Sequence, residues 1–303
     1  MSFEKVTLMQ QDCSISSSGK TSALYGNLPP SCYGKDWNGL EARDTVSSSA
    51  CWWQVVQRRW QGTELGFRIL YRAWRYRWKV ERAEIDYLLH HVRRGETVVD
   101  IGAHKGAWTY WMQKAVGLTG HVVAFEPQPE LAGYLAQACT TLHMPQVTVV
   151  PHAVSSRGGW MTLVRPQGQP SPSAAMARAS WNREDSLQVK ACTLDDYFHS
   201  HNRRPVRWIK CDVEGHELDV FRGAARVLRE DHPVLLFECE RRHHSEEPIE
   251  SVFDWLQQQG YEGHFFSRWR GSLRPLADLG EEHLSDPNAW TYKRNFLFRK
   301  RSS

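Results

Sequence analysis

The sequence has 303 residues, 41% of them hydrophobic and 14 of them tryptophan, so the chain can bury the core of one large domain or of two small ones. Its 38 basic and 34 acidic residues make it only weakly basic, and no run approaches the roughly 18 apolar residues of a membrane-spanning helix. Seven scattered cysteines form no Cys-x-x-Cys motif, which predicts a reducing, cytoplasmic compartment without a disulfide scaffold or a zinc site.

Residues 1–62 are expected to be a poorly ordered extension. Serine, glycine and other polar residues dominate to about residue 50, and no apolar period of 3.6 or 2 persists there. Residues 1–19 also lack the basic start and the apolar stretch of a secretory signal.

Residues 63–94 are expected to form an N-terminal helical cap. One stripe of the first helix carries Phe67, Leu70, Tyr71, Trp74 and Trp78, and another carries Arg68, Arg72, Arg75 and Lys79. This pattern predicts an amphipathic helix with a basic face. The basic face is interpreted first as solvated, and alternatively as a contact surface for an anionic substrate, nucleic acid or a membrane. A second helix carries Ile85, Leu88, Leu89 and Val92 at core spacing.

Residues 95–299 alternate short apolar runs with helical patterns, which predicts a Rossmann-like, doubly wound α/β domain. The sheet should be mostly parallel and seven-stranded, with an antiparallel terminal hairpin strand. The expected strands are Thr97–Ile101, His121–Phe125, Val147–Val150, Val206–Cys211, Val234–Phe237, Tyr261–Phe266 and Asn295–Arg299.

The connections between these strands carry further expected elements. One helix should include Leu218, Phe221, Ala225 and Leu228, and another should end at Gly260. Residues 160–165 and 187–192 resemble an inserted hairpin. The long loop between them, residues 166–185, is interpreted either as disordered or as a lid over a site.

The glycine-containing turn Asp100-Ile101-Gly102-Ala103-His104-Lys105-Gly106 follows the first strand. Ligands of open α/β sheets bind beyond the carboxyl ends of the strands, where such a turn lets the backbone approach a ligand closely. The next strand ends in Glu126, followed by Pro127, and a carboxylate there can accept hydrogen bonds from both ribose hydroxyls of an adenosine.

The ligand at this turn is expected to be S-adenosylmethionine. The dinucleotide fingerprint Gly-x-Gly-x-x-Gly is missing because His104 and Ala107 replace two of its glycines. The Asp100 carboxylate would suit the cationic methionine end of S-adenosylmethionine better than a diphosphate. An oxidoreductase using NAD or NADP is the runner-up, and a plain βα turn with a surface glutamate is the alternative without function.

Ionisable residues gather at the end of the fourth strand, in Lys210-Cys211-Asp212-Val213-Glu214-Gly215-His216-Glu217. Such groups are costly to bury without a task. Asp212 is the favoured general base or substrate-orienting group. Divalent metal binding by several carboxylates and a helix-dipole role for Glu217 remain alternatives. Glu238 and Glu240 add carboxylates nearby, and His243 with His244 is interpreted as a solvated loop pair rather than as metal ligands.

Taken together, these stretches resemble the FkbM-type methyltransferase family. The matching pieces are VVDIGAHKG at 98–106, FEPQPE at 125–130, PHAVSSRGG at 151–159, TLDDY at 193–197, IKCDVEGHELDVFRGA at 209–224, LFECE at 236–240 and NFLF at 295–298. The resemblance covers about residues 95–299, and its most specific piece is the Lys-x-Asp-Val-Glu-Gly block. Residues 1–94 find no support in it.

The resemblance implies a class I fold that uses S-adenosylmethionine, generally for O-methylation of small molecules or sugar units. It implies that Asp100, Gly102 and Gly106 line the methionine side, that Glu126 binds the ribose, and that His152 and Ala153 approach the adenine. The neighbours Ala103, His104 and Pro127 complete the expected cofactor site, and Lys210, Asp212 and Glu214 are the candidate catalytic residues, with no metal. Two departures are His104 with Lys105, and His152, because the family more often has asparagine at 104 and 152.

The expected partner is a small-molecule acceptor, and the basic helix favours an anionic one such as a phosphorylated or nucleotide-linked sugar. Nucleic acid is disfavoured because the Asn/Asp-Pro-Pro-Tyr/Phe motif used on nucleobase amines is absent. A non-catalytic binding protein on the same fold is the remaining alternative.

Overall fold

The computed structural model describes residues 64–165, 168–171, 173–176, 186–200, 204–244, 247–267 and 272–301. The extension expected at residues 1–62 lies outside this range. Among the described residues, none of the helices combines the length and the apolar character that crossing a bilayer requires.

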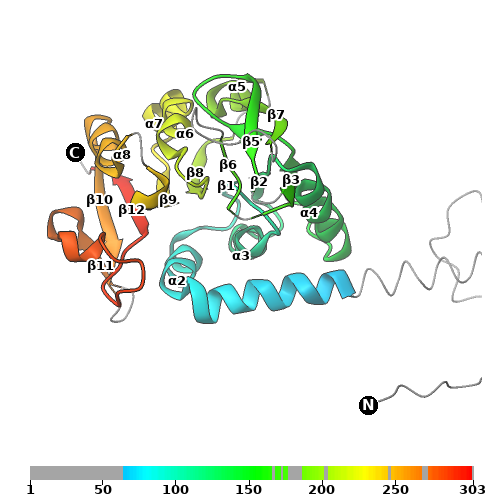
Figure 1. Ribbon diagram of the computed structural model, residues 1–303. Coiled ribbons are helices and arrows are strands. Elements are labelled where there is room, and N and C mark those ends of the chain that lie inside the picture. The colour runs from blue at the N-terminus through cyan, green and yellow to red at the C-terminus, as the bar shows by residue number, and fades with distance from the viewer. Residues whose placement is uncertain are drawn as a thin grey trace, which may run out of the picture. The chain divides into compact units, whose positions relative to one another are not determined.

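The central sheet has eight strands in the order β11-β10-β12-β9-β8-β1-β2-β3 (Figure 1). The strands from β9 to β3 run parallel, whereas β12, β10 and β11 pair antiparallel with their neighbours. Their bounds are β1 Thr97–Ile101, β2 His121–Phe125, β3 Val147–Val150, β8 Val206–Cys211, β9 Val234–Glu238, β10 Tyr261–Phe266, β11 Leu273–Pro275 and β12 Asn295–Lys300.

All seven strands expected from the sequence are present, and the mostly parallel, doubly wound fold is confirmed. The expected count of seven omits β11, an edge strand of three residues that pairs with β10. Its Leu-Arg-Pro sequence is too short to show the period of two that marks a strand. Proline is tolerated in this strand because an edge strand leaves some backbone N–H positions unpaired.

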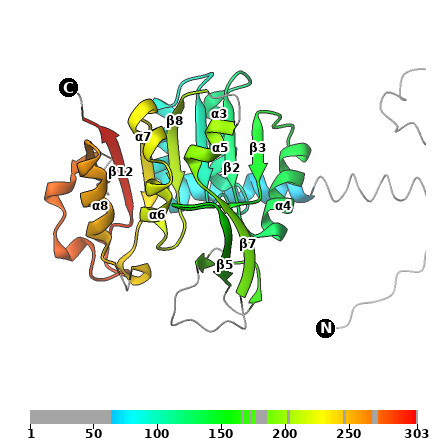
Figure 2. The same ribbon diagram turned by 90° about the horizontal axis from the view of Figure 1, so that it is seen from above.

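Helices cover both faces of the central sheet (Figures 1 and 2). On one face lie α2 (Arg82–His91), α3 (Ala107–Val116) and α4 (Pro129–Thr141), which pack on residues such as Val98, Val122 and Ala124. On the other face lie α5 (Leu194–Ser200), α6 (Glu217–Arg222), α7 (Ala225–Asp231) and α8 (Ile249–Gln258). Their core contacts include Val99 and Val123, because successive residues of a strand point to opposite faces.

The prediction of a single helix with Leu218, Phe221, Ala225 and Leu228 is wrong, because the chain forms the two helices α6 and α7 instead. Gly223 ends α6, and a Cβ atom at this position would lie 2.0 Å from the backbone oxygen of Ser155. The chain therefore changes direction at a contact that only glycine permits. The expected helix that ends at Gly260 is present as α8.

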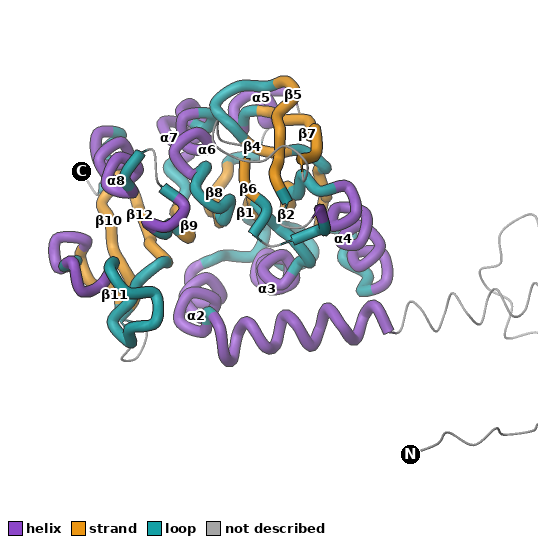
Figure 3. Tube along the Cα trace, viewed as in Figure 1, coloured by secondary structure: helices purple, strands orange, loops and turns teal. Residues whose placement is uncertain are grey.

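The hairpin inserted between β3 and β8 is confirmed. It forms a second sheet in the order β4-β7-β5-β6, in which β5 (Gly159–Val164) pairs antiparallel with β7 (Ser186–Cys192). The short strands β4 (Ala153–Val154) and β6 (Ala175–Met176) lie at its edges (Figure 3). Three short 3-10 helices complete the described part of the chain: η5 (Arg241–His243), η6 (Leu276–Asp278) and η7 (Glu281–His283).

The amphipathic helix expected near the N-terminus is present at residues 64–75 and continues into a π-helical turn, η2 (Tyr76–Val80). Its buried side is formed by Leu65, Ile69 and Ala73 rather than by the aromatic stripe. These smaller side chains allow close packing against Ala138 of α4 and against the core beneath α2 and α3. The aromatic stripe consequently points to solvent.

Candidate active site

A cavity of about 210 Å³ opens at the carboxyl ends of the parallel strands. Its wall includes residues that directly follow β1, β2 and β8, among them Gly102, Glu126 and Asp212. This is the edge at which open α/β sheets bind their ligands.

The turn after β1 is shaped by the close approach of two loops. Gly102 has φ +75°, and a Cβ atom there would lie 1.9 Å from the backbone oxygen of Asp212. The backbone N–H groups of Gly102 and Ala103 both donate to the oxygen of Phe125, at 3.0 Å. The cavity wall formed by β1, β2 and β8 is thereby fixed largely by backbone contacts.

His104 contributes an unpaired polar atom to the cavity wall. Its backbone has φ 49°, a left-handed conformation that His, Asn and Asp adopt more readily than most residues. Its Nε2 atom is buried and has no hydrogen-bond partner among the described residues. Burial, helped by the charges of Lys105 and Arg72, lowers the pKa of His104 to about 4. A neutral imidazole nitrogen is therefore available to a ligand at neutral pH.

Glu126 lines the same cavity and is held by two backbone groups. The N–H of His104 donates to its Oε2 at 2.8 Å, and the N–H of Gln128 donates to its Oε1 at 2.9 Å. Burial raises the pKa of Glu126 to about 7, although these hydrogen bonds oppose the rise. Each carboxylate oxygen keeps a second lone pair, so the group can still accept two hydroxyl donors.

Part of the long loop at 166–185 also reaches the cavity. Ser171, Ala174 and Met176 belong to its wall, together with the expected residues Pro127, His152 and Ala153. The Gln128 side-chain amide donates to the backbone oxygen of Ser171 at 2.9 Å, and its Oε1 accepts from the backbone N–H of Ser171 at 3.0 Å. These two hydrogen bonds fasten the described part of the loop to the cavity rim.

Four of the expected site residues lie behind the cavity rather than in its wall: Asp100, Ala103, Gly106 and Lys210. Asp100 is fully buried, accepts a hydrogen bond from the Thr109 hydroxyl at 2.6 Å, and has one oxygen without a partner. Burial raises the pKa of the Asp100 carboxyl.

Lys210 is buried beside Asp212, with 3.1 Å between its Nζ and Oδ2 of Asp212. Burial alone would lower the pKa of Lys210, but the carboxylates of Asp212, Asp100 and Glu81 outweigh it and raise the pKa. Lys210 is thus a buried cation that neutralises the carboxylates around it.

The other acidic candidate in the cavity wall, Glu214, contacts His243, with 2.7 Å between Oε2 of Glu214 and Nδ1 of His243. A second pair, between His244 Nε2 and Glu217 Oε2, spans 2.9 Å. The side chains of His243 and His244 are 23% and 5% exposed, so the interpretation of a solvated loop pair is wrong. Each histidine side chain points inward because it contacts an acidic residue that follows β8, Glu214 for His243 and Glu217 for His244.

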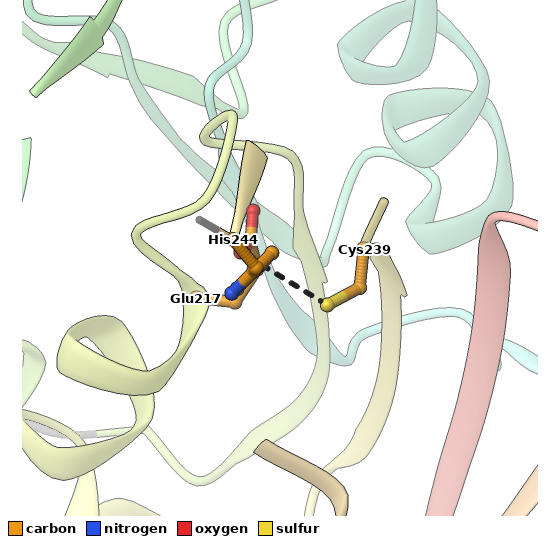
Figure 4. A group of neighbouring side chains, drawn as sticks. All are labelled: Glu217, Cys239 and His244. Carbon is orange, nitrogen blue, oxygen red and sulfur yellow. Dashed lines mark hydrogen bonds and ion pairs between the residues drawn. The ribbon is translucent and has the colours of Figure 1, made fainter. Parts of the chain in front are cut away.

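His244, Glu217 and Cys239 form a compact group of donor atoms (Figure 4). The Cys239 sulfur lies 3.3 Å from Nε2 of His244, and all three donor atoms fall within 4.8 Å of one another. These donor types suit Zn²⁺. None of the three belongs to the cavity wall, so the group sits beside the candidate active site.

The cavity wall also contains residues that the sequence did not mark as site residues, among them Tyr76, Glu81, Arg242 and Arg294. Glu81 accepts a hydrogen bond from Trp108 Nε1 at 2.6 Å, and burial raises its pKa. Arg294 lies 3.8 Å from Glu81 and 3.7 Å from Glu238. No motif marks these positions, and their charged and polar sequence neighbours gave no signal of a buried site.

The sheet, with antiparallel β12 inserted between β9 and β10, and the cavity at its carboxyl edge form the class I methyltransferase fold. The model of the FkbM methyltransferase domain matches residues 100–262, and the chain belongs to this family. The nicotinamide-dependent oxidoreductase is thereby set aside.

A curated relative is the hexuronic acid methyltransferase AglP of Haloferax volcanii, 27% identical over 166 residues. The match covers 54% of this chain and 64% of AglP, slightly less than two thirds of the relative's length.

Solved structures with a similar fold include an FkbM methyltransferase from Methylobacillus flagellatus (TM-score 0.43, 16% identity, 81% of this chain and 60% of that chain). Another is a Streptococcus mutans methyltransferase in complex with SAH (TM-score 0.42, 11% identity, 72% of this chain and 96% of that chain).

The cavity wall suits S-adenosylmethionine, the cofactor expected from the sequence. The Glu126 carboxylate can accept hydrogen bonds from a vicinal diol, such as the two ribose hydroxyls. The buried Nε2 atom of His104 has no partner among the described residues, and a polar ligand can provide one. Gly102 keeps the turn free of a side chain.

Proposed function

We propose that the protein transfers a methyl group to a hydroxyl oxygen of an anionic sugar. The observation that carries this proposal is that Arg242 and Arg294 line the same cavity as Asp212. A guanidinium in this position can pair with a sugar carboxylate, and the relative AglP is named for a hexuronic acid.

At the cofactor end, Glu126 binds the ribose hydroxyls and His104 offers its free ring nitrogen. Gly102 faces the methionine part, with Asp100, Ala103 and Gly106 behind it, while Pro127, His152 and Ala153 flank the adenine. Bound S-adenosylmethionine supplies an electrophilic methyl carbon whose sulfonium sulfur leaves with the bonding electron pair.

At the acceptor end, Arg294 is the main partner for the anionic group. Its side chain is 37% exposed and its two acidic neighbours lie beyond 3.5 Å, so its hydrogen-bond donors remain available to a ligand. Burial raises the pKa of Glu238 to about 9, with the Asp212 charge adding to the effect. Glu238 therefore carries a proton at neutral pH, which reduces the repulsion that an anionic acceptor would meet.

Asp212 accepts the hydrogen bond of the acceptor hydroxyl and directs its oxygen toward the methyl carbon. As the new C–O bond forms and the C–S bond breaks, the hydroxyl proton leaves toward the Asp212 carboxylate. The Lys210 ammonium holds that carboxylate in place. Asp212 thereby positions the hydroxyl at the distance and angle that methyl transfer requires. Glu214, held by His243, supports the acceptor from the same loop.

The test is methyl transfer from radiolabelled S-adenosylmethionine to glucuronic acid, to its nucleotide-linked form and to neutral glucose. We expect transfer to the two uronic acids and little to glucose. The product should resist mild alkali, because a methyl ether is stable where a methyl ester is hydrolysed. An alkali-labile product would show that the sugar carboxylate, and not a hydroxyl, is methylated. Absence of transfer to every sugar would favour a different acceptor or a non-catalytic protein.

Arg294→Gln sharpens the test. Loss of a charge-assisted hydrogen bond should raise the KM for the uronic acid by about tenfold to a hundredfold, with a smaller effect on kcat. The matched control is Arg299→Gln in β12, the strand that begins directly after Arg294, because Arg299 pairs with Glu262 outside the cavity. An equal KM in the two variants would remove Arg294 from acceptor binding.

A further inference from the structure

The helix at residues 64–75 buries only one of its sides. Leu65, Ile69 and Ala73 face the domain. The opposite side, together with the following turn η2, carries a row of exposed aromatic side chains. These are Phe67, Tyr71, Trp74 and Trp78, which are 70%, 64%, 44% and 52% exposed.

This row accounts for most of the large hydrophobic side chains that the described surface exposes. Seven such residues are exposed among the described residues, and four of them lie between residues 67 and 78. Scattered exposed aromatics need no explanation, whereas a contiguous row marks a surface that contacts something apolar. Trp74 and Trp78 stack on each other, with 6.1 Å between their ring centroids, so the row is ordered as one ridge.

Positive charge surrounds the same ridge. Residues 64–80 contain five basic residues and one acidic residue, Glu64. Arg77 packs over Trp74 and Trp78 and pairs with Asp86, which leaves it occupied. Arg75 and Lys79 are exposed and form no ion pair with any described residue. Two cations beside the ridge are thus available to an anionic partner.

We propose that this ridge binds the surface of a membrane that contains anionic lipid, with the helix lying parallel to the bilayer. Trp and Tyr side chains prefer the headgroup level of a bilayer, because each joins an apolar ring to a polar N–H or O–H group, and Phe67 adds apolar area. Basic side chains at the border of such a helix pair with lipid phosphates, and their apolar stems lie along the interface. The domain side of the helix stays packed, so binding needs no unfolding.

The experiment is co-sedimentation of the full chain with vesicles. One set contains phosphatidylcholine with phosphatidylglycerol, and the other contains phosphatidylcholine alone. We expect binding to the anionic vesicles to be tighter by about tenfold or more, and to weaken as salt is added. Binding to neither vesicle, or equally to both at all salt concentrations, would overturn the proposal.

Two double variants separate the contributions. Phe67→Ser with Tyr71→Ser removes apolar area, and Arg75→Glu with Lys79→Glu reverses two charges; each should weaken binding by about tenfold or more. The matched control is Trp160→Ser, because Trp160 of β5 is 67% exposed but lies outside the ridge. Circular dichroism checks that each variant folds.

The remaining outcomes identify another occupant. Full binding by the Phe67/Tyr71 variant, or an equal loss in the Trp160 control, would reject the aromatic ridge as the contact. Tighter binding to a single-stranded oligonucleotide than to anionic vesicles would assign the ridge to nucleic acid. A dimer in light scattering that the Phe67/Tyr71 variant dissociates, without vesicle binding, would assign it to a second copy of the chain.

Discussion

The Nζ atom of Lys210 lies 3.1 Å from Oδ2 of Asp212, which joins a buried cation to a carboxylate in the cavity wall. The pair fixes one oxygen of Asp212. The other oxygen has no hydrogen bond to a described residue, so it remains available to an acceptor hydroxyl.

Replacement of Asp212 by asparagine tests this arrangement. Asparagine keeps an oxygen for Lys210 but loses the negative charge, so we expect kcat to fall about a hundredfold or more while S-adenosylmethionine still binds. Initial rates and calorimetric titration measure the two quantities. Asp219→Asn is the control, because Asp219 is half-exposed on α6 and lies outside the cavity wall. Unchanged turnover in the Asp212 variant would remove the residue from the mechanism.

The pH dependence of cofactor binding tests the role of Glu126. Its pKa is raised to about 7 by burial, so the carboxylate is progressively lost as pH falls through 7. If the ionised form binds the ribose, the dissociation constant for S-adenosylmethionine should be about tenfold larger at one pH unit below that pKa than well above it. Calorimetric titration across this range measures the change.

The matched variant for this experiment is Glu126→Gln. It should bind the cofactor weakly at every pH, because an amide accepts from ribose hydroxyls poorly. Its dissociation constant should therefore lack the titration near pH 7. A wild-type constant that stays level across the range would detach Glu126 from the ribose.

Most of the sheet was predictable because its parallel strands are buried on both faces. A strand such as His121–Phe125 then reads as a nearly continuous apolar run, and its bounds agree with the structure. The division of the connection between β8 and β9 into the two helices α6 and α7 was not predictable in the same way. The break at Gly223 depends on the oxygen of Ser155, which is distant in sequence.

The candidate site was predictable only where a motif follows a strand. Glu126 and Asp212 do so, and both line the cavity. Glu81 and Arg294 come from segments outside the motifs, and folding alone brings them to within 3.8 Å of each other. The side of the first helix that faces the core was not predictable, for another reason. Both of its sides are apolar, and periodicity cannot tell which one faces the core.

A pair of glycine variants tests the turn after β1. Gly102→Ala should destabilise the protein by about 3 kcal/mol or more, because φ is +75° and the new Cβ would meet the Asp212 oxygen. Gly133→Ala in the middle of α4 has open space around it and should gain about 1 kcal/mol from helix propensity. Urea unfolding compares the two. Equal stability of both variants would show that the turn tolerates a side chain.

Removal of metal ions tests the group formed by Glu217, Cys239 and His244. The carboxylate–imidazole hydrogen bond of 2.9 Å satisfies Glu217 and His244 without an ion, and none of the three residues lines the cavity. We therefore expect methyl transfer to survive dialysis against a chelator unchanged. His244→Ala, by contrast, leaves the buried Glu217 carboxylate without this partner, so it should cost about 1–3 kcal/mol of stability with or without metal. If the chelator abolishes transfer and Zn²⁺ restores it, the three donors hold a metal that the reaction requires.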